Sequence, residues 1–421
     1  MTITPTGLRA HEILDSRGRP TLHVDLLTAT GTFTAQVPSG ASTGSGEAVE
    51  LRDHDPARYA GAGVLIAVGH VDGPIAEAIT GRSFEDQADL DAALCALDGT
   101  ANKSRLGANA IVGVSLAAAR AFAAAAGTPL WSSLRVADEA PRLPVPHFNV
   151  VNGGAHAPNP LDFQEFMIAP LGTPSYAEAL RAGAEVYARL RTRLAGAGHA
   201  TGLGDEGGFA PDLARPEEVL ETLVAAIGDA GYALGTGGVA IALDPAASEF
   251  GAEGTYTVAG QRLSSAEMIS YYEELVGRFP IWSIEDGLGE DDVAGWQELT
   301  GRLGERIQLV GDDNLVTNPR IIRDAISHGI ANAALIKVNQ IGTVTETLEA
   351  MTLCRQNGYA AMVSHRSGET PDAFIADLVV GSGCGQIKSG APARGERVAK
   401  YNRILEIGLE DSALPYGLAA R

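Results

Sequence analysis

The chain has 421 residues, of which 45% are hydrophobic and 20% are charged, and its formal net charge at pH 7 is −21. A chain of this length exceeds the size at which one hydrophobic core keeps growing, so we expect a globular protein of two domains. The acidic balance argues against nucleic acid or an anionic membrane as the main binding partner, although a local basic pocket can still bind a phosphate group.

Cysteine usage and hydropathy indicate the compartment. Cys95, Cys354 and Cys384 form no close pair and no metal-ligand spacing, which is typical of a reducing environment. No basic segment followed by an apolar one opens the chain. The longest stretch of small apolar residues, 108–119, is too short and too polar to cross a bilayer. We therefore expect a cytoplasmic protein without a membrane-spanning segment.

The N-terminal third of the chain predicts an α+β domain, which we place at residues 1–130. Residues 4–37 alternate between apolar and polar side chains as strands do, and an antiparallel meander is the simplest arrangement for them. Helical patterns follow at residues 64–79, 87–96 and 108–126, where Ala and Leu dominate the last of the three.

Two segments without a regular pattern lie within and after this region. Residues 38–47 are too rich in Gly and Ser for a regular element, and we interpret them as a mobile loop that can act as a lid. A solvated linker is the alternative for the same residues. Residues 137–146 contain three prolines and predict the linker to a second domain at residues 140–421.

Between residues 239 and 390, apolar runs repeatedly end in a residue with a chemically useful side chain. The residues at these ends are Asp244, Glu285, Asp312, Lys337, the triplet His365, Arg366 and Ser367, and Lys388. Runs rich in Val, Ile and Leu with helical sequence between them predict parallel strands that alternate with helices, which is an α/β barrel. Because the carboxyl ends of all barrel strands open on one face, we expect these side chains to converge there.

Three acids in that series predict a metal site. Two bare carboxylates about 4 Å apart repel each other by roughly 4 kcal/mol at an effective dielectric constant near 20, so a cation must offset the charge of Asp244, Glu285 and Asp312. Carboxylate oxygens without Cys or His in the set favour Mg²⁺ over zinc. The alternative for each acid alone is that it caps the following helix, but the ordered series favours the metal.

Two further acids lie in unusual surroundings. Glu165 lies inside the apolar run 163–168, where an ionised carboxylate is costly unless it is paired, and a structural ion pair is its simplest interpretation without other context. Glu206 belongs to an acidic pair that three glycines enclose in residues 204–208. Glycine at such density indicates a close approach of the backbone to a ligand.

Short motifs spread over nearly the whole chain resemble those of the enolase family, and they occur in the family's order. The matching segments are residues 15–18, 39–44, 102–110, 152–156, 164–167, 204–208, 283–286, 311–313, 337–342, 364–370 and 385–388. The resemblance implies an α+β N-terminal domain followed by an enolase-type (β/α)8 barrel whose early strands depart from strict alternation. It also implies a phosphopyruvate hydratase, a lyase that reversibly dehydrates 2-phospho-D-glycerate to phosphoenolpyruvate in glycolysis and gluconeogenesis.

The resemblance assigns roles to individual residues. By motif, Asp244, Glu285 and Asp312 hold one Mg²⁺, and Ser42 coordinates a second one when the loop closes. Lys337 is the base that takes the C2 proton and must be neutral to do so. Glu206 is the general acid for the leaving 3-hydroxyl, with Glu165 beside it to keep one proton on the pair. The residues that match substrate contacts are His156, Gln164, His365, Arg366, Ser367 and Lys388, of which Arg366 and Ser367 match the phosphate site.

Some positions depart from the usual enolase pattern, at a subunit contact above all. The family typically pairs a Glu of the N-terminal sheet with an Arg near the C-terminus, whereas this chain has His23 and Glu406 there, and His11 stands where an Arg faces an acid that matches Glu185. We expect a homodimer with pH-sensitive contacts between histidines and acids, and higher oligomers are left open.

These departures also leave other functions open. One alternative is an enolase paralogue of a biosynthetic pathway that acts on a phosphonate or a related analogue. A less favoured one is a binding or scaffold protein on an inactive enolase fold, because such a protein has no need to retain Lys337, Glu206 and the three acids. In each case we expect no nucleic acid and no membrane as partners.

Overall fold

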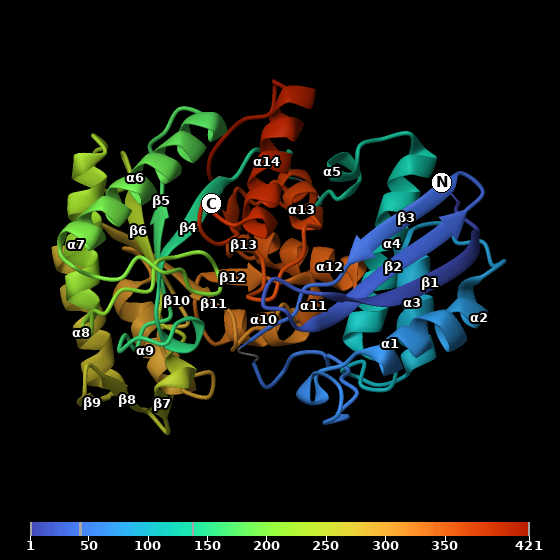
Figure 1. Ribbon diagram of the computed structural model, residues 1–421, viewed down its shortest axis with the longest axis horizontal. Coiled ribbons are helices and arrows are strands. Elements are labelled where there is room, and N and C mark those ends of the chain that lie inside the picture. The colour runs from blue at the N-terminus through green and yellow to red at the C-terminus, as the bar shows by residue number, and fades with distance from the viewer. Residues whose placement is uncertain (1, 42–43, 137–138, 420–421) are drawn as a thin grey trace.

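The computed structural model describes residues 2–41, 44–136 and 139–419. Its N-terminal part is a three-stranded antiparallel sheet covered by helices (Figure 1). The strands are β1 (Pro5–Leu14), β2 (Pro20–Thr28) and β3 (Gly31–Gln36), and the helices are α1 (Leu65–His70), α2 (Ala76–Ile79), α3 (Gln87–Asp98), α4 (Ala108–Ala126) and α5 (Leu130–Ser133), with a short 3₁₀ turn η1 (Tyr59–Gly61) before them. The predicted meander is confirmed.

The predicted helix over residues 64–79 is interrupted in its middle. A π-helical turn, η2 (Val71–Ile75), separates α1 from α2, and it contains Pro74. Proline has no backbone N–H and its ring crowds the preceding turn, so a regular α-helix cannot run through this position. The sequence pattern predicted one helix over residues 64–79, whereas the structure has two short α-helices joined by a π-helical turn.

Helix α4 is the core helix of the N-terminal part. Of the helices in the described ranges, it alone is long and apolar enough to cross a membrane by length and composition, but 78% of its most apolar window is buried inside the protein. It packs on β2 and β3. At Gly113 a Cβ atom would lie 2.6 Å from a methyl group of Val24, so this close packing requires glycine. The apolar character of α4 is that of a buried helix.

The C-terminal part is a closed barrel of eight strands. Its hydrogen-bonded order is β10–β11–β12–β13–β14–β4–β5–β6, so that the last strand in sequence lies beside the first. The strands are β4 (Val145–Asn152), β5 (Glu165–Ala169), β6 (Ala240–Asp244), β10 (Ile281–Glu285), β11 (Gln308–Gly311), β12 (Ala333–Ile336), β13 (Ala360–Ser364) and β14 (Gln386–Lys388). All are parallel except β5, which runs antiparallel to both of its neighbours.

Helices surround this barrel on its outer side (Figure 1). They are α6 (Tyr176–Gly196), α7 (Pro216–Asp229), α8 (Ser265–Arg278), α9 (Val293–Leu303), α10 (Pro319–Ser327), α11 (Val338–Ile341), α12 (Val344–Gln356), α13 (Phe374–Ser382) and α14 (Gly395–Glu410). Short turns η3 (Gly154–His156) and η4 (Ala247–Glu249) and a small sheet of β7 (Gly251–Ala252), β8 (Thr255–Val258) and β9 (Gln261–Ser264) complete the part.

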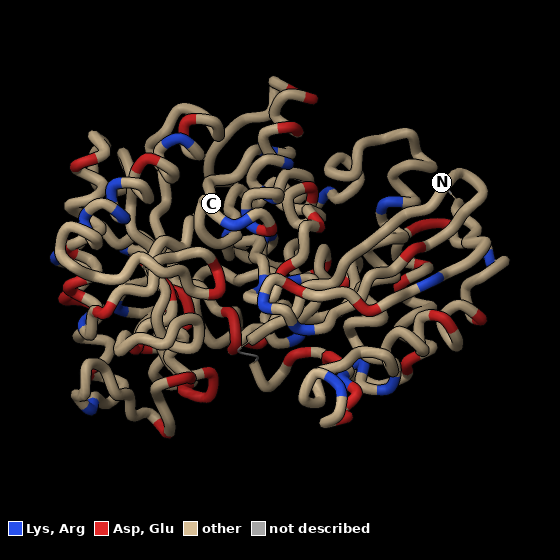
Figure 2. Tube along the Cα trace, viewed as in Figure 1, with Lys and Arg blue, Asp and Glu red and all other residues tan. Residues whose placement is uncertain are grey.

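The strand arrangement accounts for the sequence pattern of residues 239–390. Strands β6 and β10 to β14 are nearly continuous apolar runs, because both of their faces are buried. Two strands, β4 and β5, precede the first barrel helix, so the early strands depart from strict alternation as the family resemblance implied. Asp and Glu residues are spread along the chain in both parts (Figure 2). The mouth of the barrel faces the N-terminal part.

Candidate active site

One pocket at the carboxyl ends of the barrel strands is lined by almost all of the predicted site residues. Those that line it are His156, Gln164, Glu165, Glu206, Asp244, Asp312, Lys337, His365, Arg366, Ser367 and Lys388. Glu285 is the last residue of β10 and contacts the Lys388 amine of this pocket. Ser42 lies outside the described residues. The free space is only about 20 Å³, since the charged side chains contact one another.

Lys388 neutralises the acids on one side of the pocket. Its Nζ lies 2.8 Å from Asp244 Oδ2, 2.7 Å from Glu285 Oε1 and 3.1 Å from Glu165 Oε1. Burial alone lowers the pKa of a lysine, but here Asp244, Glu165 and Glu285 outweigh it and raise the pKa of Lys388 well above its usual range. Lys388 therefore carries a full positive charge among acids from three strands.

Lys337 makes the equivalent contact on the other side. It follows β12, and its Nζ is in direct contact with Asp312 Oδ2, while Gln340 donates to Asp312 Oδ1 at 2.8 Å. Burial, Arg366 and Lys388 lower the pKa of Lys337, but Asp312 outweighs them and raises it. The predicted base requires a neutral amine. Here the contact with Asp312 favours the charged form of Lys337 instead.

The oxygen ligands in the pocket fit a divalent cation. Oε2 of Glu285 is buried and has no hydrogen-bond partner among the described residues. Burial, followed by the charge of Asp244, raises the pKa of Glu285 well above its usual range, which shows how strongly these acids repel one another. Three carboxylates on neighbouring strand ends form a hard oxygen set suited to Mg²⁺. A cation in this set would relieve the repulsion.

The three predicted metal ligands do not form one compact group in this structure. Two groups have ligand atoms that all lie within 4.8 Å of one another in the described ranges, and they consist of His156, Glu165 and Glu206, and of Asp286, Asp312 and Asp313. Neither group contains Asp244 or Glu285. Lys388 contacts both of these acids from within the pocket. Asp286 in turn accepts from the backbone N–H groups of Asp312 at 2.8 Å and Asp313 at 2.9 Å, which holds the loop after β11.

Glu165 and Glu206 form the acid pair that the motifs predicted. His156 Nδ1 lies 3.7 Å from Glu165 Oε1 and 3.8 Å from Glu206 Oε1. Burial and the charge of Glu206 raise the pKa of Glu165 well above its usual range. Burial also acts to raise the pKa of Glu206, but His365, His156 and Arg397 outweigh it and lower this pKa well below the usual range. The pKa values of these two neighbouring carboxyl groups are therefore displaced in opposite directions.

Around Glu206, two buried polar side chains approach Oε2. Asn149 Nδ2 donates to it at 3.1 Å, and His365 Nε2 lies 3.0 Å away. Burial lowers the pKa of His365 to about 4, so the imidazole is neutral at physiological pH. Both of these contacting groups are therefore neutral.

The loop after β13 presents Arg366 and Ser367. Arg366 Nη1 lies 3.0 Å from Glu47 Oε2, Arg366 Nη2 donates to Glu47 Oε1 at 3.1 Å, and Nη1 also donates to Asn339 Oδ1 at 3.1 Å. Arg17 Nη1 donates to Ser367 Oγ at 3.1 Å. Two guanidinium groups and a hydroxyl therefore lie together, as a site for phosphate oxygens requires.

Comparison with known proteins agrees with this geometry over the whole chain. The model of the enolase C-terminal TIM barrel domain matches residues 140–415, and the model of the enolase N-terminal domain matches residues 6–134. The chain belongs to the enolase family. Its relatives named enolase include those of Rubrobacter xylanophilus, 58% identical over 98% of this chain and 97% of the relative, and of Acidothermus cellulolyticus, 56% identical over 98% and 96%. The enolase of Legionella pneumophila strain Corby is 53% identical over 97% of each chain.

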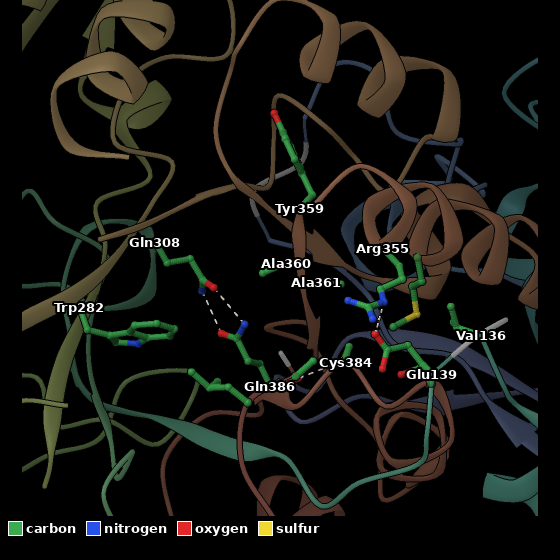
Figure 3. A pocket seen from close by; sticks show the side chains of 15 residues that line it. Val136, Glu139, Trp282, Gln308, Arg355, Tyr359, Ala360, Ala361, Cys384 and Gln386 are labelled. Carbon is green, nitrogen blue, oxygen red and sulfur yellow. Dashed lines mark hydrogen bonds and ion pairs between the residues drawn. The ribbon is translucent and has the colours of Figure 1, made fainter. Parts of the chain in front are cut away.

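A second cavity lies at the opposite end of this enolase-family barrel and has a different character (Figure 3). It has a volume of about 200 Å³ and is lined by residues at the starts of strands, among them Trp282, Gln308 and Gln386. The two glutamine amides donate to each other at 2.9 Å in both directions, and Arg355 pairs with Glu139 at the side (Figure 3). Since residues at the amino ends of barrel strands serve stability, this larger cavity is not the site of the chemistry.

Several residues of the enolase-family pocket were not predicted as part of it. Arg17 belongs to the segment 15–18 that carries the resemblance, and Glu47 ends the Gly/Ser-rich segment, but neither had an assigned role. Asn149 was detectable as a polar residue inside an apolar strand. Arg397 could not be identified from the sequence, because nothing in the residue pattern of α14 indicates that this side chain reaches the pocket.

Proposed function

We propose that this protein is an Mg²⁺-dependent enolase that reversibly dehydrates 2-phospho-D-glycerate to phosphoenolpyruvate. The observation that carries the proposal is the convergence of two lysines, four acids and the Arg366–Ser367 pair on one buried pocket of an enolase-family chain. The reaction removes a proton from C2, expels the 3-hydroxyl as water and forms the C2–C3 double bond. Each of these events needs one of the groups assembled here.

Lys337 is the base for the C2 proton in this proposal. Its ammonium form is stabilised by the contact with Asp312. Burial, Arg366 and Lys388 each act to lower its pKa, so the amine loses its proton once Asp312 no longer lies against it. The free amine then takes the proton from C2.

Glu206 and Glu165 supply the acid for the leaving hydroxyl. The pair holds one proton because two buried carboxylates at this distance cannot both ionise without large repulsion. That proton is the one the 3-hydroxyl needs to leave as water. Asn149 and His365 hold Oε2 of Glu206, so the carboxyl group approaches the substrate in one orientation.

We further propose that Asp244, Glu285 and Asp312 hold one Mg²⁺ and that Ser42 contributes to a second, which makes two ions for each active site. When bound, the ions supply Lewis-acid stabilisation of the charge that builds up on the substrate carboxylate. Lys388 adds a fixed positive charge beside the same group. Arg366 and Ser367 bind the phosphate, and His156 and Gln164 close the pocket around the rest of the substrate.

The direct test is turnover of 2-phosphoglycerate, followed by the absorbance of phosphoenolpyruvate. We expect a kcat in the ordinary range of about 1 to 1,000 s⁻¹ with Mg²⁺. We expect loss of activity in EDTA and at least a roughly 100-fold lower kcat in Lys337→Ala, because a positioned base contributes about that much or more. Arg323→Ala, which removes an exposed charge on α10, is the control and retains activity. Turnover far below this range would favour a paralogue that acts on a phosphonate or related analogue.

A homodimer in the cytoplasm is the state we propose for the enzyme. The free Cys95, Cys354 and Cys384 support the cytoplasmic location. The exposure of the two acids predicted at the subunit contact supports the dimer. The carboxylate-bearing side chains of Glu185 and Glu406 are 46% and 64% exposed. His11 and His23 face each other across β1 and β2, with their rings stacked at 4.3 Å. Sedimentation between about pH 5.5 and 8.5 tests the contact, and a dimer equally tight across this range would contradict its dependence on histidine.

The division of the chain into an N-terminal domain at residues 1–130 and a catalytic barrel at residues 140–421 is part of the same proposal. It is supported by the three-stranded sheet and its helices lying before residue 134 and by the barrel strands beginning at Val145. Expression of residues 140–421 alone would test whether the barrel folds without the N-terminal part.

A further inference from the structure

Arg397 is a buried charge whose contacts are nearly all to the active-site loops. It lies in the first turn of α14 and is completely inaccessible to solvent. Its guanidinium donates to the carbonyl oxygens of Arg366 at 2.5 Å, Ser367 at 2.6 Å and Asp205 at 3.2 Å. A buried guanidinium is costly unless its donors are used, so this arginine stabilises loops from two distant parts of the chain.

The same guanidinium also faces the imidazole of His365. Arg397 Nη1 lies 2.5 Å from His365 Nδ1. A guanidinium has five N–H donors, has no acceptor and does not lose its proton in proteins. Nδ1 of His365 must therefore be the acceptor and carry no proton. In a neutral imidazole the proton then resides on Nε2.

The ring nitrogen that carries this proton lies next to the carboxylate of Glu206. His365 Nε2 lies 3.0 Å from Glu206 Oε2. The other charged groups that act on the imidazole are Arg397 itself and Glu369, whose carboxylate is paired with Lys400 at 2.8 Å. Burial keeps the ring neutral by lowering its pKa to about 4. Nε2 makes no hydrogen bond within the described residues, so this tautomer leaves a protonated nitrogen, rather than a lone pair, 3.0 Å from the carboxylate.

We infer that Arg397 is a positioning residue that fixes His365 in the Nε2–H tautomer and so places a protonated ring nitrogen beside Glu206. The inference rests on the proposed function for its catalytic meaning, but the tautomer itself is a property of the protein alone. With the opposite tautomer, the Nε2 lone pair would face the Glu206 carboxylate and repel it.

The tautomer is measured directly on the full-length protein with ¹⁵N-labelled histidine. In the wild type we expect a bare, pyridine-type signal for Nδ1 of His365 and a protonated, pyrrole-type signal for Nε2, assigned by their loss in His365→Gln. Observation of the Nδ1–H tautomer in the wild type would overturn the inference. This result does not depend on turnover, so it remains readable even if 2-phosphoglycerate is not the substrate.

A matched pair of variants distinguishes control of the His365 tautomer by Arg397 from simple stabilisation of the loops. Arg394 is three residues earlier and donates to the carbonyl oxygens of Ser16 at 2.9 Å and Gly204 at 3.4 Å. In Arg397→Lys we expect the pure His365 tautomer to be lost and kcat to fall by roughly 10- to 100-fold, by more than KM rises. In Arg394→Lys we expect the tautomer to be retained.

Each result of this comparison either supports or contradicts the role inferred for Arg397. An unchanged His365 tautomer in folded Arg397→Lys, with thermal unfolding as the check on folding, would contradict the inference. Equal losses of kcat in the two variants with the tautomer intact in both would show that the arginines act only as clamps. If Arg397→Lys does not fold, the wild-type tautomer still confirms or contradicts the assignment.

Discussion

Glu47 and Arg366 form a two-point ion pair between the Gly/Ser-rich segment and the loop after β13. Oε2 of Glu47 lies 3.0 Å from Nη1 of Arg366, and Oε1 accepts from Nη2 at 3.1 Å. The two residues are 319 positions apart in the chain. A carboxylate therefore occupies the guanidinium fork that we propose for the substrate phosphate, and the substrate must displace it.

This pair predicts that Glu47→Gln binds phosphorylated substrate more tightly. The variant keeps the shape of the side chain but removes a negative charge that competes with the phosphate. If the competition is worth about 1 kcal/mol, KM for 2-phosphoglycerate falls roughly 5-fold. Glu290→Gln is the control, since Glu290 also contacts the same segment through Ser45 but is not paired with Arg366. An unchanged or higher KM in Glu47→Gln would show that the carboxylate instead prepares the arginine for phosphate.

The unpartnered oxygen of Glu285 predicts how the metal affects stability. Mg²⁺ that binds only the folded protein stabilises it by about 2.7 kcal/mol at a concentration 100-fold above its Kd. We expect Mg²⁺ to raise the unfolding temperature of the wild type relative to EDTA. In Glu285→Gln the shift should be much smaller, because one charged ligand is lost. A full shift in Glu285→Gln would place the stabilising ion elsewhere.

Removal of Lys388 should expose the repulsion among the acids that it binds. In Lys388→Met without metal, Asp244, Glu285 and Glu165 lose their buried countercharge, and we expect a loss of about 3 kcal/mol or more in the free energy of unfolding. The measurement is urea unfolding in EDTA at pH 8 and pH 5.

The pH dependence of this variant has a definite sign. The pKa values of Glu165 and Glu285 are raised in the folded protein, so the folded state takes up protons on acidification before the unfolded state does. The loss in Lys388→Met should therefore be smaller at pH 5 than at pH 8. Lys103→Met is the control, since Lys103 is also buried but pairs with Glu346 alone at 2.8 Å, and its loss should not depend on pH in this way.

His147 predicts a separate acid-sensitive contribution to stability. It lies in β4, and Trp282 Nε1 donates to its Nε2 at 3.1 Å. Burial lowers the pKa of His147 from 6.5 to about 4. As pH falls from 6.5 to about 4, the unfolded state gains a proton on this residue that the folded state does not, so folding stability decreases by roughly 3 kcal/mol over this window.

The matched variants for this contribution are His147→Gln and His54→Asn. The glutamine can still accept from Trp282 but does not titrate, so the decline of stability between pH 6.5 and 4 should be less steep than in the wild type. His54 is exposed, and its replacement should leave the slope unchanged. Identical slopes in the wild type and His147→Gln would mean that the buried imidazole is protonated in the folded state.

Much of the barrel was predictable from local pattern. Asp244 and Glu285 end buried strands, and Asp312, Lys337 and His365 directly follow them, because a parallel strand that is buried on both faces is apolar up to the point where it reaches the mouth. The antiparallel direction of β5 was not predictable from periodicity, since a buried run of five residues reads the same in either direction. The family resemblance implied only that the early strands depart from strict alternation, not the direction of this one.

The sequence by itself determined which residues end the strands and therefore which chemical groups share the barrel mouth, since burial leaves a local signature of apolar runs. The tertiary structure decided which charges meet. Closure of β14 against β4 brings Lys388 to the acids of β5, β6 and β10, and the return of α14 brings Arg397 to His365. Electrostatic contacts act over a few ångströms between residues that are hundreds of positions apart, so only the folded chain specifies them.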